Sequence, residues 1–260
     1  MPLITSQIPE SWEQLELLVT AILSECGMEA RRQIALDLPR GTVDVDVLAE
    51  ENVDGIIHRT ICECKNWQHN IPKDVVHAFR TVMQETGAHR GYIVSKVGFQ
   101  SGAILAAHST NIELVTFAEF QEKHFEKWIK TQLWAIEEEI GAFNTYYEPL
   151  GPPGYSKLAN DEERAAYDAV FEKYAFAGLM LQPFSPYLRI ARPYPLPPLP
   201  FNVAEIEARG LIVPDDIKVA AAYREFFRLL VAHAKKGLAA LRAVNPITRG
   251  TPSESVTRDD

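Results

Sequence analysis

The dipeptide Asp54-Gly55, which lies between two strand-like runs, constrains the fold of this chain more than any other feature. An Asp-Gly pair between such runs favours a two-residue hairpin turn. Residues 43–49 and 57–65 are therefore predicted to pair as antiparallel strands.

The numbering predicts which residues of the hairpin oppose one another. If the turn is centred on Asp54-Gly55, then Asp46 lies opposite Glu63, and Asp44 lies opposite Lys65. Since side chains alternate along a strand, these four side chains are predicted to share one face with Ile61. The other face is predicted to be core, and its members are Val43, Val45, Val47, Cys62 and Cys64.

Acids and a lysine on one strand face suit phosphodiester chemistry. Like charges directly across a ladder repel each other, so Asp46 opposite Glu63 is unfavourable unless a cation lies between them. Mg²⁺ or Mn²⁺ accepts one or two carboxylates together with water and phosphate oxygens. Lys65 could then orient the attacking water or stabilise charge on the phosphate. Glu63-Cys64-Lys65 alone is an ordinary pattern for a solvated strand, and the opposed Asp46 makes it specific.

The rest of residues 1–120 predicts an α/β domain. The expected order is a helix at 11–26, a strand at 28–38, the hairpin, a helix from Pro72 to Gly87, a strand at 92–95, a helix at 99–108 and a strand at 112–117. The first helix is marked by a capping pattern at its start and by an apolar stripe that consists of Trp12, Leu15, Leu18, Val19, Ile22, Leu23 and Cys26. Helical crossovers between the later strands favour parallel pairing, so the sheet is predicted to be mixed.

Beyond residue 120 the sequence predicts a mainly helical region. Helices are expected at 121–142, 161–180 and 215–244, with a Gly/Pro-rich loop at 146–160 between the first two. Within 184–203 lies a proline-rich strap, residues 192–200, which is expected to be partly extended. The domain prediction is therefore a domain at 1–120, a helical region at 121–245, and a disordered tail at 246–260.

Charge and cysteine content limit the classes of function. The net charge is −9, and it divides into −7 for residues 1–120 (9 Lys and Arg against 16 Asp and Glu) and −2 for the remainder (17 against 19). Nucleic-acid enzymes usually present a basic surface, so basic residues must be focused on one face, or a partner or homo-oligomer must supply affinity. Three cysteines indicate reduced thiols and a cytoplasmic protein. No apolar run is long enough for a membrane span, and the N-terminus does not resemble a signal peptide.

Residues 10–120 resemble the PD-(D/E)xK nuclease superfamily, and within it the Mrr-like restriction endonucleases. The resemblance rests on the first helix up to Gly27, on the strand 41–47, on Cys62-Glu63-Cys64-Lys65-Asn66-Trp67, on Val75 and Phe79 of the next helix, and on residues 91–103. It implies a three-layer restriction-endonuclease-like core around a mixed sheet. Residues 121–260 carry no such resemblance.

The resemblance also implies roles for individual residues. By position, Asp46 and Glu63 would be the metal ligands, and Lys65 would be the catalytic lysine. Asp44 competes with Asp46 for the first role, because it lies two residues away on the same face. Glu16 matches a helical acid that often completes the site, and it is equally well explained as a solvated helix residue.

Other polar residues near these positions are weaker candidates. Lys73, Arg80 and Lys96 are the basic residues expected to contact phosphates, together with Arg90, although each is also explained as a surface charge. Three histidines, which are His69, His77 and His89, are not needed for the chemistry. Asn66-Trp67 departs from the basic-aromatic pair that many relatives carry, and Trp67 is expected to pack near the site.

The leading hypothesis is a magnesium-dependent endonuclease that hydrolyses phosphodiester bonds in double-stranded DNA, as a restriction or anti-phage effector. The alternative is a non-catalytic nuclease-fold module that serves assembly or nucleic-acid binding, with partners engaged through the C-terminal helices. Cleavage of RNA or branched DNA by the same residues is a further alternative. The chain has no Gly-rich phosphate loop of the ATPase type, so ATP hydrolysis by this chain is not expected.

Overall fold

The computed structural model describes residues 3–38, 41–191 and 195–249. The chain divides into two compact units, residues 1–132 and residues 133–260. The boundary falls inside one long helix, α4 (Phe117–Asn144), and not at residue 120.

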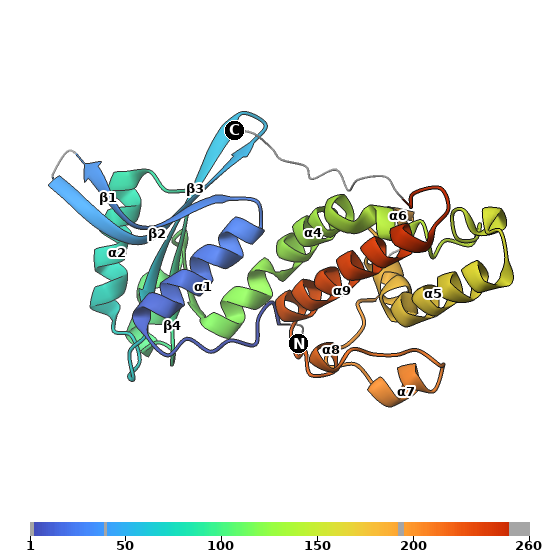
Figure 1. The fold of residues 1–260 in the computed structure, drawn as a ribbon. Helices are drawn as coiled ribbons and strands as arrows, with labels where there is room; N and C mark the ends of the chain where they lie inside the picture. Colours follow the sequence, from blue (N-terminus) through green and yellow to red (C-terminus); the bar gives the residue numbers. More distant parts are fainter. Residues whose placement is uncertain (1–2, 39–40, 192–194, 250–260) are drawn as a thin grey trace. The chain divides into compact units, whose positions relative to one another are not determined.

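The first unit is built on a five-stranded mixed sheet, in the order β1-β2-β3-β4-β5 (Figure 1). The strands are β1 (Glu29–Leu38), β2 (Gly41–Val53), β3 (Ile56–Lys65), β4 (Arg90–Ser95) and β5 (Ile112–Thr116). The first three strands pair antiparallel, whereas β3, β4 and β5 pair in parallel. Helices α2 (Lys73–Thr86) and α3 (Ser101–Ala107) connect the parallel strands, as helical crossovers do. The predicted mixed α/β sheet is confirmed.

Helices cover both faces of this sheet. On one face, a hydrophobic cluster joins Val76 and Phe79 of α2 to Ile61 and Ile93 of the central strands. On the other face lie α1 (Trp12–Glu25) and the first half of α4, where Phe120 and His124 contact the ring of Tyr92. The result is a three-layer arrangement with β3 near its centre.

The hairpin forms with the predicted turn. Asp54 and Gly55 both have positive φ, of 52° and 84°, as a turn between two antiparallel strands requires. The pairing runs from Val53 opposite Ile56 to Val47 opposite Cys62, which is the predicted register. Beyond Val47 the pairing of β2 with β3 ends, so the predicted backbone pair of Asp46 with Glu63 does not form.

The side chains of the hairpin lie on their predicted faces only between the turn and Val47. Val45 packs in the same cluster as Leu48 and Ile61, and Val43 packs against that cluster, so both valines lie on the α2 face. Their assignment to the opposite face is wrong. The alternation of side chains along β2 is broken at Asp46. The pairing of β1 with β2 skips Asp46 and, on the other strand, Gln33, and Gln33 has a positive φ of 50°.

The second unit is helical. Its elements are the remainder of α4, η1 (Tyr155–Lys157), α5 (Asp161–Leu181), η2 (Gln182–Phe184), α6 (Pro186–Ala191), α7 (Val203–Glu207), α8 (Asp215–Lys218) and α9 (Tyr223–Val244). Helices α5 and α9 pack along each other. Gly237 of α9 makes this packing close, since a Cβ added there would lie 2.8 Å from the ring of Tyr174.

Three predicted boundaries in the helical region differ from the structure. The helix predicted at 121–142 begins at Phe117, directly after β5. The helix predicted at 215–244 is two helices, because the chain between α8 and α9 is extended at Ala222 and buries Ala220 and Ala222. Residues 184–203 contain the short helix α6 before the proline-rich strap. Residues 192–194 of the strap and 250–260 of the predicted tail lie outside the described residues.

Within the described ranges, no helix combines the length and the apolar character needed to cross a membrane. The three cysteines, Cys26, Cys62 and Cys64, are buried thiols that form no disulfide among the described residues.

Candidate active site

Asp46 lies where β2 separates from β3, and its carboxylate bridges the separation. Asp46 Oδ2 accepts a hydrogen bond of 2.7 Å from the backbone N–H of Cys64. The carboxylate thus replaces the backbone acceptor that an unbroken ladder would supply, and it lies beside the strand that carries Glu63 and Lys65. The interruption of the sheet is what turns Asp46 toward these residues.

Glu63 and Lys65 follow one another on the same face of β3 and form an ion pair. Burial of the Glu63 carboxyl, together with the negative charge of Asp46, raises its pKa, although Lys65 acts in the opposite sense. Burial of the Lys65 ammonium would lower its pKa, but attraction by Glu63 and Asp46 raises it overall. Lys65 is therefore a fixed positive charge at neutral pH, held among acids in a partly dry site.

Glu16 of α1 brings a third carboxyl close to Asp46. Glu16 is only 2% exposed, and its Oε2 accepts a hydrogen bond of 3.3 Å from Gln33 Nε2. Burial and the nearby charge of Asp46 raise the pKa of Glu16. The alternative reading of Glu16 as a solvated helix residue is therefore wrong, because the residue is buried.

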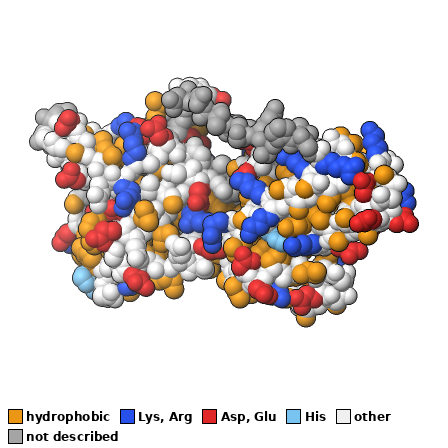
Figure 2. Space-filling view, viewed as in Figure 1, with side chains coloured by type: hydrophobic (Ala, Val, Ile, Leu, Met, Phe, Trp, Pro, Cys, Tyr) orange, Lys and Arg blue, Asp and Glu red, His pale blue; other side chains and the backbone are white. Residues whose placement is uncertain are grey.

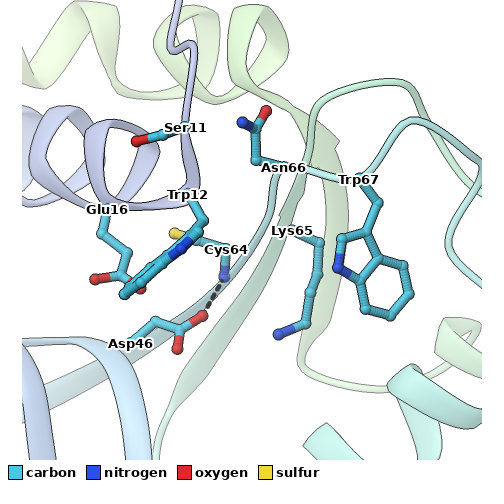
Figure 3. A pocket seen from close by; sticks show the side chains of 8 residues that line it. All are labelled: Ser11, Trp12, Glu16, Asp46, Cys64, Lys65, Asn66 and Trp67. Carbon is cyan, nitrogen blue, oxygen red and sulfur yellow. Dashed lines mark hydrogen bonds between the residues drawn. The ribbon is translucent and has the colours of Figure 1, made fainter.

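The site opens into a pocket of about 330 Å³ (Figure 3). Its lining residues are Ser11, Trp12, Glu16, Asp46, Cys64, Lys65, Asn66 and Trp67. Figure 3 shows the side chains of Asp46 and Glu16 on one side and those of Lys65 and Trp67 on the other. The Lys65 ammonium lies 5.9 Å from the centre of the Trp67 ring, which is within reach of a cation–π interaction.

Sequence reasoning missed part of this lining. Trp12 was expected in the buried stripe of the first helix, but it is 49% exposed and lines the pocket. Asn66 donates from Nδ2 to the carbonyl of Glu10, while its buried Oδ1 has no partner among the described residues. A tryptophan at the first position of a helix, next to its Ser11 cap, was the available signal, because the first helical residue often lies at the rim of a domain.

The other predicted residues lie outside the pocket lining. Asp44 is exposed on β2 and does not line the pocket. Lys96 is exposed directly after β4, and its backbone N–H donates to the carbonyl of Lys65, so it lies beside the site. Lys73 and Arg80 are exposed on α2, and Arg90 pairs with Glu113 at 2.8 Å.

The three histidines are also placed by the structure. His69 stacks on Trp67 near the site, and His77 is exposed on α2. His89 accepts a hydrogen bond from the backbone N–H of Arg59, near the far end of β3. Its role there is structural.

The donor set can be tested for its fit to a divalent cation. Asp46 and Glu63 offer only carboxylate oxygens, which are the ligands that Mg²⁺ and Mn²⁺ prefer. Among the described residues, no group of three or more His, Cys, Asp and Glu side chains is arranged to hold a metal. Burial and the charge of Asp46 raise the pKa of Glu63, and a bound cation would favour its ionised form. The residues fit a two-carboxylate site that leaves further positions for water and phosphate.

Comparison with known proteins agrees with the resemblance noted in the sequence. Residues 9–124, just under half of the chain, match the model of a family described as a restriction endonuclease. The resemblance of residues 10–120 to the Mrr-like nucleases is thereby confirmed for this part of the chain, and it marks residues 9–124 as a nuclease-type domain. The match ends within α4, so it includes all five strands of the sheet.

Two further comparisons add no assignment. No curated protein matches the chain. The crystal structure of a protein of unknown function, AF1548, is 17% identical, with a TM-score of 0.38, and the alignment covers 88% of this chain and 98% of that one.

Proposed function

We propose that this protein is a metal-dependent endonuclease that hydrolyses phosphodiester bonds in double-stranded DNA. The observation that carries the proposal is the placement of the Asp46 carboxylate beside the Glu63–Lys65 pair, at a break in the sheet that opens into a pocket. The family match over residues 9–124 supports the reaction class and a role in cutting foreign DNA.

Each of the three residues has a distinct part in this proposal. Asp46 and Glu63 would hold Mg²⁺ or Mn²⁺, which when bound supplies a more acidic water and neutralises charge on the phosphate. Lys65, held as a cation by Glu63 and Asp46, stabilises the negative charge that develops on the phosphate oxygens during attack. Glu16, buried and close to Asp46, limits the positions that the Asp46 carboxylate can take and is a positioning residue.

The structure favours Asp46 over Asp44 for the first acidic role. The Asp46 carboxylate is fixed by the N–H of Cys64 and lines the pocket, whereas Asp44 is exposed on the same strand and lies outside the lining. Asp44 therefore provides a matched control, since it has the same side chain two residues away.

Plasmid cleavage with Mg²⁺ tests the proposal. We expect Asp46→Asn, Glu63→Gln and Lys65→Met each to reduce the cleavage rate by about 10²-fold or more, because each removes a charge that acts on the reacting phosphate. Asp44→Asn should cleave at the wild-type rate. Full activity in Glu63→Gln would refute the mechanism. A wild-type protein that binds DNA but never cleaves it with Mg²⁺ or Mn²⁺ would favour the non-catalytic module instead.

A further inference from the structure

Basic residues are concentrated in one segment of an otherwise acidic chain. Residues 221–250 contain six Lys and Arg and a single acid, Glu225, a local balance of +5 in a chain of net charge −9. No Asp or Glu occurs between Glu225 and Glu254. A helix face that is merely solvated usually alternates positive and negative side chains. This segment does not.

Most of these residues lie on one face of α9. Arg228, Lys235 and Arg242 recur every seven residues, so they follow one line along the helix, and Lys236 lies next to this line. All four are exposed, and we call them the α9 basic face. The buried residues of α9 face the other way, and they are Tyr223, Phe226, Phe227, Leu230, Val231, Ala234, Gly237 and Leu241. In the half of Figure 2 that holds α9, blue side chains gather along the helix.

The cations of this face are largely uncompensated. Lys235 pairs with Glu139 of α4. Within the described part of the chain, Arg228, Lys236 and Arg242 make no ion pair. Their charge is therefore available to an external anion.

A lysine from a second helix extends the positive charge. Burial lowers the pKa of His233, Asp216 opposes this, and Lys236 and Lys173 each lower it further. Lys173 of α5 therefore acts on the same histidine as Lys236 of α9. It is exposed, as the cations of α9 are. Lys173 thus adds a positive charge near Lys236, while Asp216 of α8 acts on the same histidine with the opposite sign.

We propose that the α9 basic face binds the phosphate backbone of double-stranded DNA and supplies affinity that the acidic nuclease-type domain lacks. This inference rests on the proposed function, since it names how the same substrate is held. Arg228 and Arg242 are fourteen residues apart, or about 21 Å along the helix. A duplex carries one negative charge per ~1.7 Å of axis, so a segment of this length presents about twelve phosphates.

The small residues of this face support a close approach of the backbone. Ala232 and Ala239 are exposed between the cations, at positions where longer side chains would keep a duplex away from the helix. Phosphate contacts of this kind carry no sequence information, so the face is expected to position DNA without selecting a sequence.

Binding measurements on the full-length protein test this inference. Fluorescence anisotropy with a labelled 30-base-pair duplex, in EDTA to prevent cleavage, gives the affinity at several salt concentrations. The variant Arg228→Gln/Lys236→Gln/Arg242→Gln should bind roughly tenfold to a hundredfold more weakly at about 0.1 M salt. The slope of log K against log salt should fall in magnitude by about 2.7, because each lost phosphate contact removes about 0.9.

A second triple variant controls for net charge. Lys130→Gln/Lys157→Gln/Arg209→Gln removes the same charge from exposed positions outside the α9 basic face, and it should change affinity by less than about threefold. Circular dichroism confirms that both variants are folded. Equal weakening in both variants, or unchanged binding after loss of the three α9 cations, would overturn the proposal. Tighter binding of an RNA duplex of equal length would overturn DNA as the ligand.

The outcomes separate this inference from the proposed function. If the α9 variant binds as the wild type does while the wild type cleaves plasmid with Mg²⁺, the inference fails and the nuclease assignment stands. If the wild type binds through α9 but does not cleave DNA, the inference stands and the nuclease assignment fails.

Discussion

Asp46 shows how a single residue can link a break in the fold to a candidate active site. The pairing of β2 with β1 skips Asp46, and the pairing of β2 with β3 ends at Val47, the next residue. The Asp46 carboxylate instead accepts a hydrogen bond from the N–H of Cys64. The same interruption leaves one carboxylate oxygen free to act beside Glu63. A regular ladder would instead have placed Asp46 directly opposite Glu63, with both acids fixed by sheet geometry.

The raised pKa of Glu63 predicts that the site is kept at a cost in stability. Because burial and Asp46 raise the pKa in the folded state, the ionised carboxylate opposes folding when no metal is present. We expect Glu63→Gln to melt at a higher temperature than the wild type at pH 7 in EDTA. Each kcal/mol gained corresponds to about 2–4 °C for a domain of this size.

The pH dependence of that difference follows from the direction of the shift. A raised carboxyl pKa means that stability is fully present below the ordinary value of 4.5 and is lost as the pH rises through the folded-state pKa. The two proteins should therefore differ most at neutral pH and converge below about pH 4, as measured by calorimetry. Mg²⁺ should raise the melting temperature of the wild type more than that of Glu63→Gln. A variant that is less stable at pH 7 would contradict the prediction.

The sequence predicted which residues lie near the break in the sheet better than it predicted the face of the sheet on which each side chain lies. Asp46 and Lys65 line the pocket, whereas Glu63, which pairs with Lys65, is not part of the lining. The face of Val45 was predicted wrongly, because alternation can be counted only along an unbroken ladder. At the break, Gln33 of β1 has a left-handed φ of 50° and is skipped in the pairing together with Asp46, and no local pattern in the sequence predicts this.

At the scale of elements, the sheet and its helices were predictable where local signals were strong. The hairpin turn has a distinctive dipeptide, and α2 begins just after Pro72 and ends at Gly87, which has a left-handed φ of 63°. The start of α4 was predicted late, since β5 passes into α4 without a loop. A break such as that between α8 and α9 depends on tertiary burial of small alanines, which helix propensity does not reveal.

The packing of β4 against α2 gives a prediction about a glycine. A Cβ at Gly91 would lie 2.7 Å from both Phe79 Cε1 and Met83 Sδ, so Gly91→Ala overfills the core between β4 and α2. We expect it to lower the free energy of unfolding by about 1–3 kcal/mol, measured by urea denaturation. The matched control is Gly102→Ala in α3, where the nearest atoms are 3.8 Å away. That change should be neutral or stabilise by up to about 1 kcal/mol.

The two substitutions should differ in their effect on the free energy of unfolding, which Gly91→Ala should lower and Gly102→Ala should leave unchanged or raise. Loss of stability in both would mean that any added methyl disturbs this layer, and a neutral Gly91→Ala would mean that α2 can move away from β4 at little cost. The first result would contradict the room for a methyl group at Gly102, and the second would contradict the close packing at Gly91.

For the whole molecule, the distribution of charge matters more than its sum. A net charge of −9 argues against binding nucleic acid, yet the cations of residues 221–250 are gathered in a region that the nuclease family match does not include. The candidate site residues and the α9 basic face thus belong to different units of the chain. Composition alone could not have revealed this division, because it averages over both units.

The position of the unit boundary inside α4 leads to the last prediction. Residues 121–132 bury Phe125, Trp128 and Ile129 within the first unit. The side chain of Gln121 accepts a hydrogen bond of 2.9 Å from the N–H of Thr5, which ties α4 to the start of the chain. Removing three such apolar side chains forfeits roughly 5–9 kcal/mol of burial, comparable with the whole stability of a typical domain.

A fragment of residues 1–132 should therefore fold, whereas a fragment of residues 1–120 should not. We expect 1–132 to show a cooperative thermal transition by circular dichroism, and 1–120 to aggregate or to lack a transition. The longer fragment ends at Gln132. The side chain of this residue donates to the carbonyl of Glu25 and so holds the first half of α4 against α1. Equal melting temperatures for the two fragments would show that residue 120 closes the domain, and that the first half of α4 serves only to join the two units.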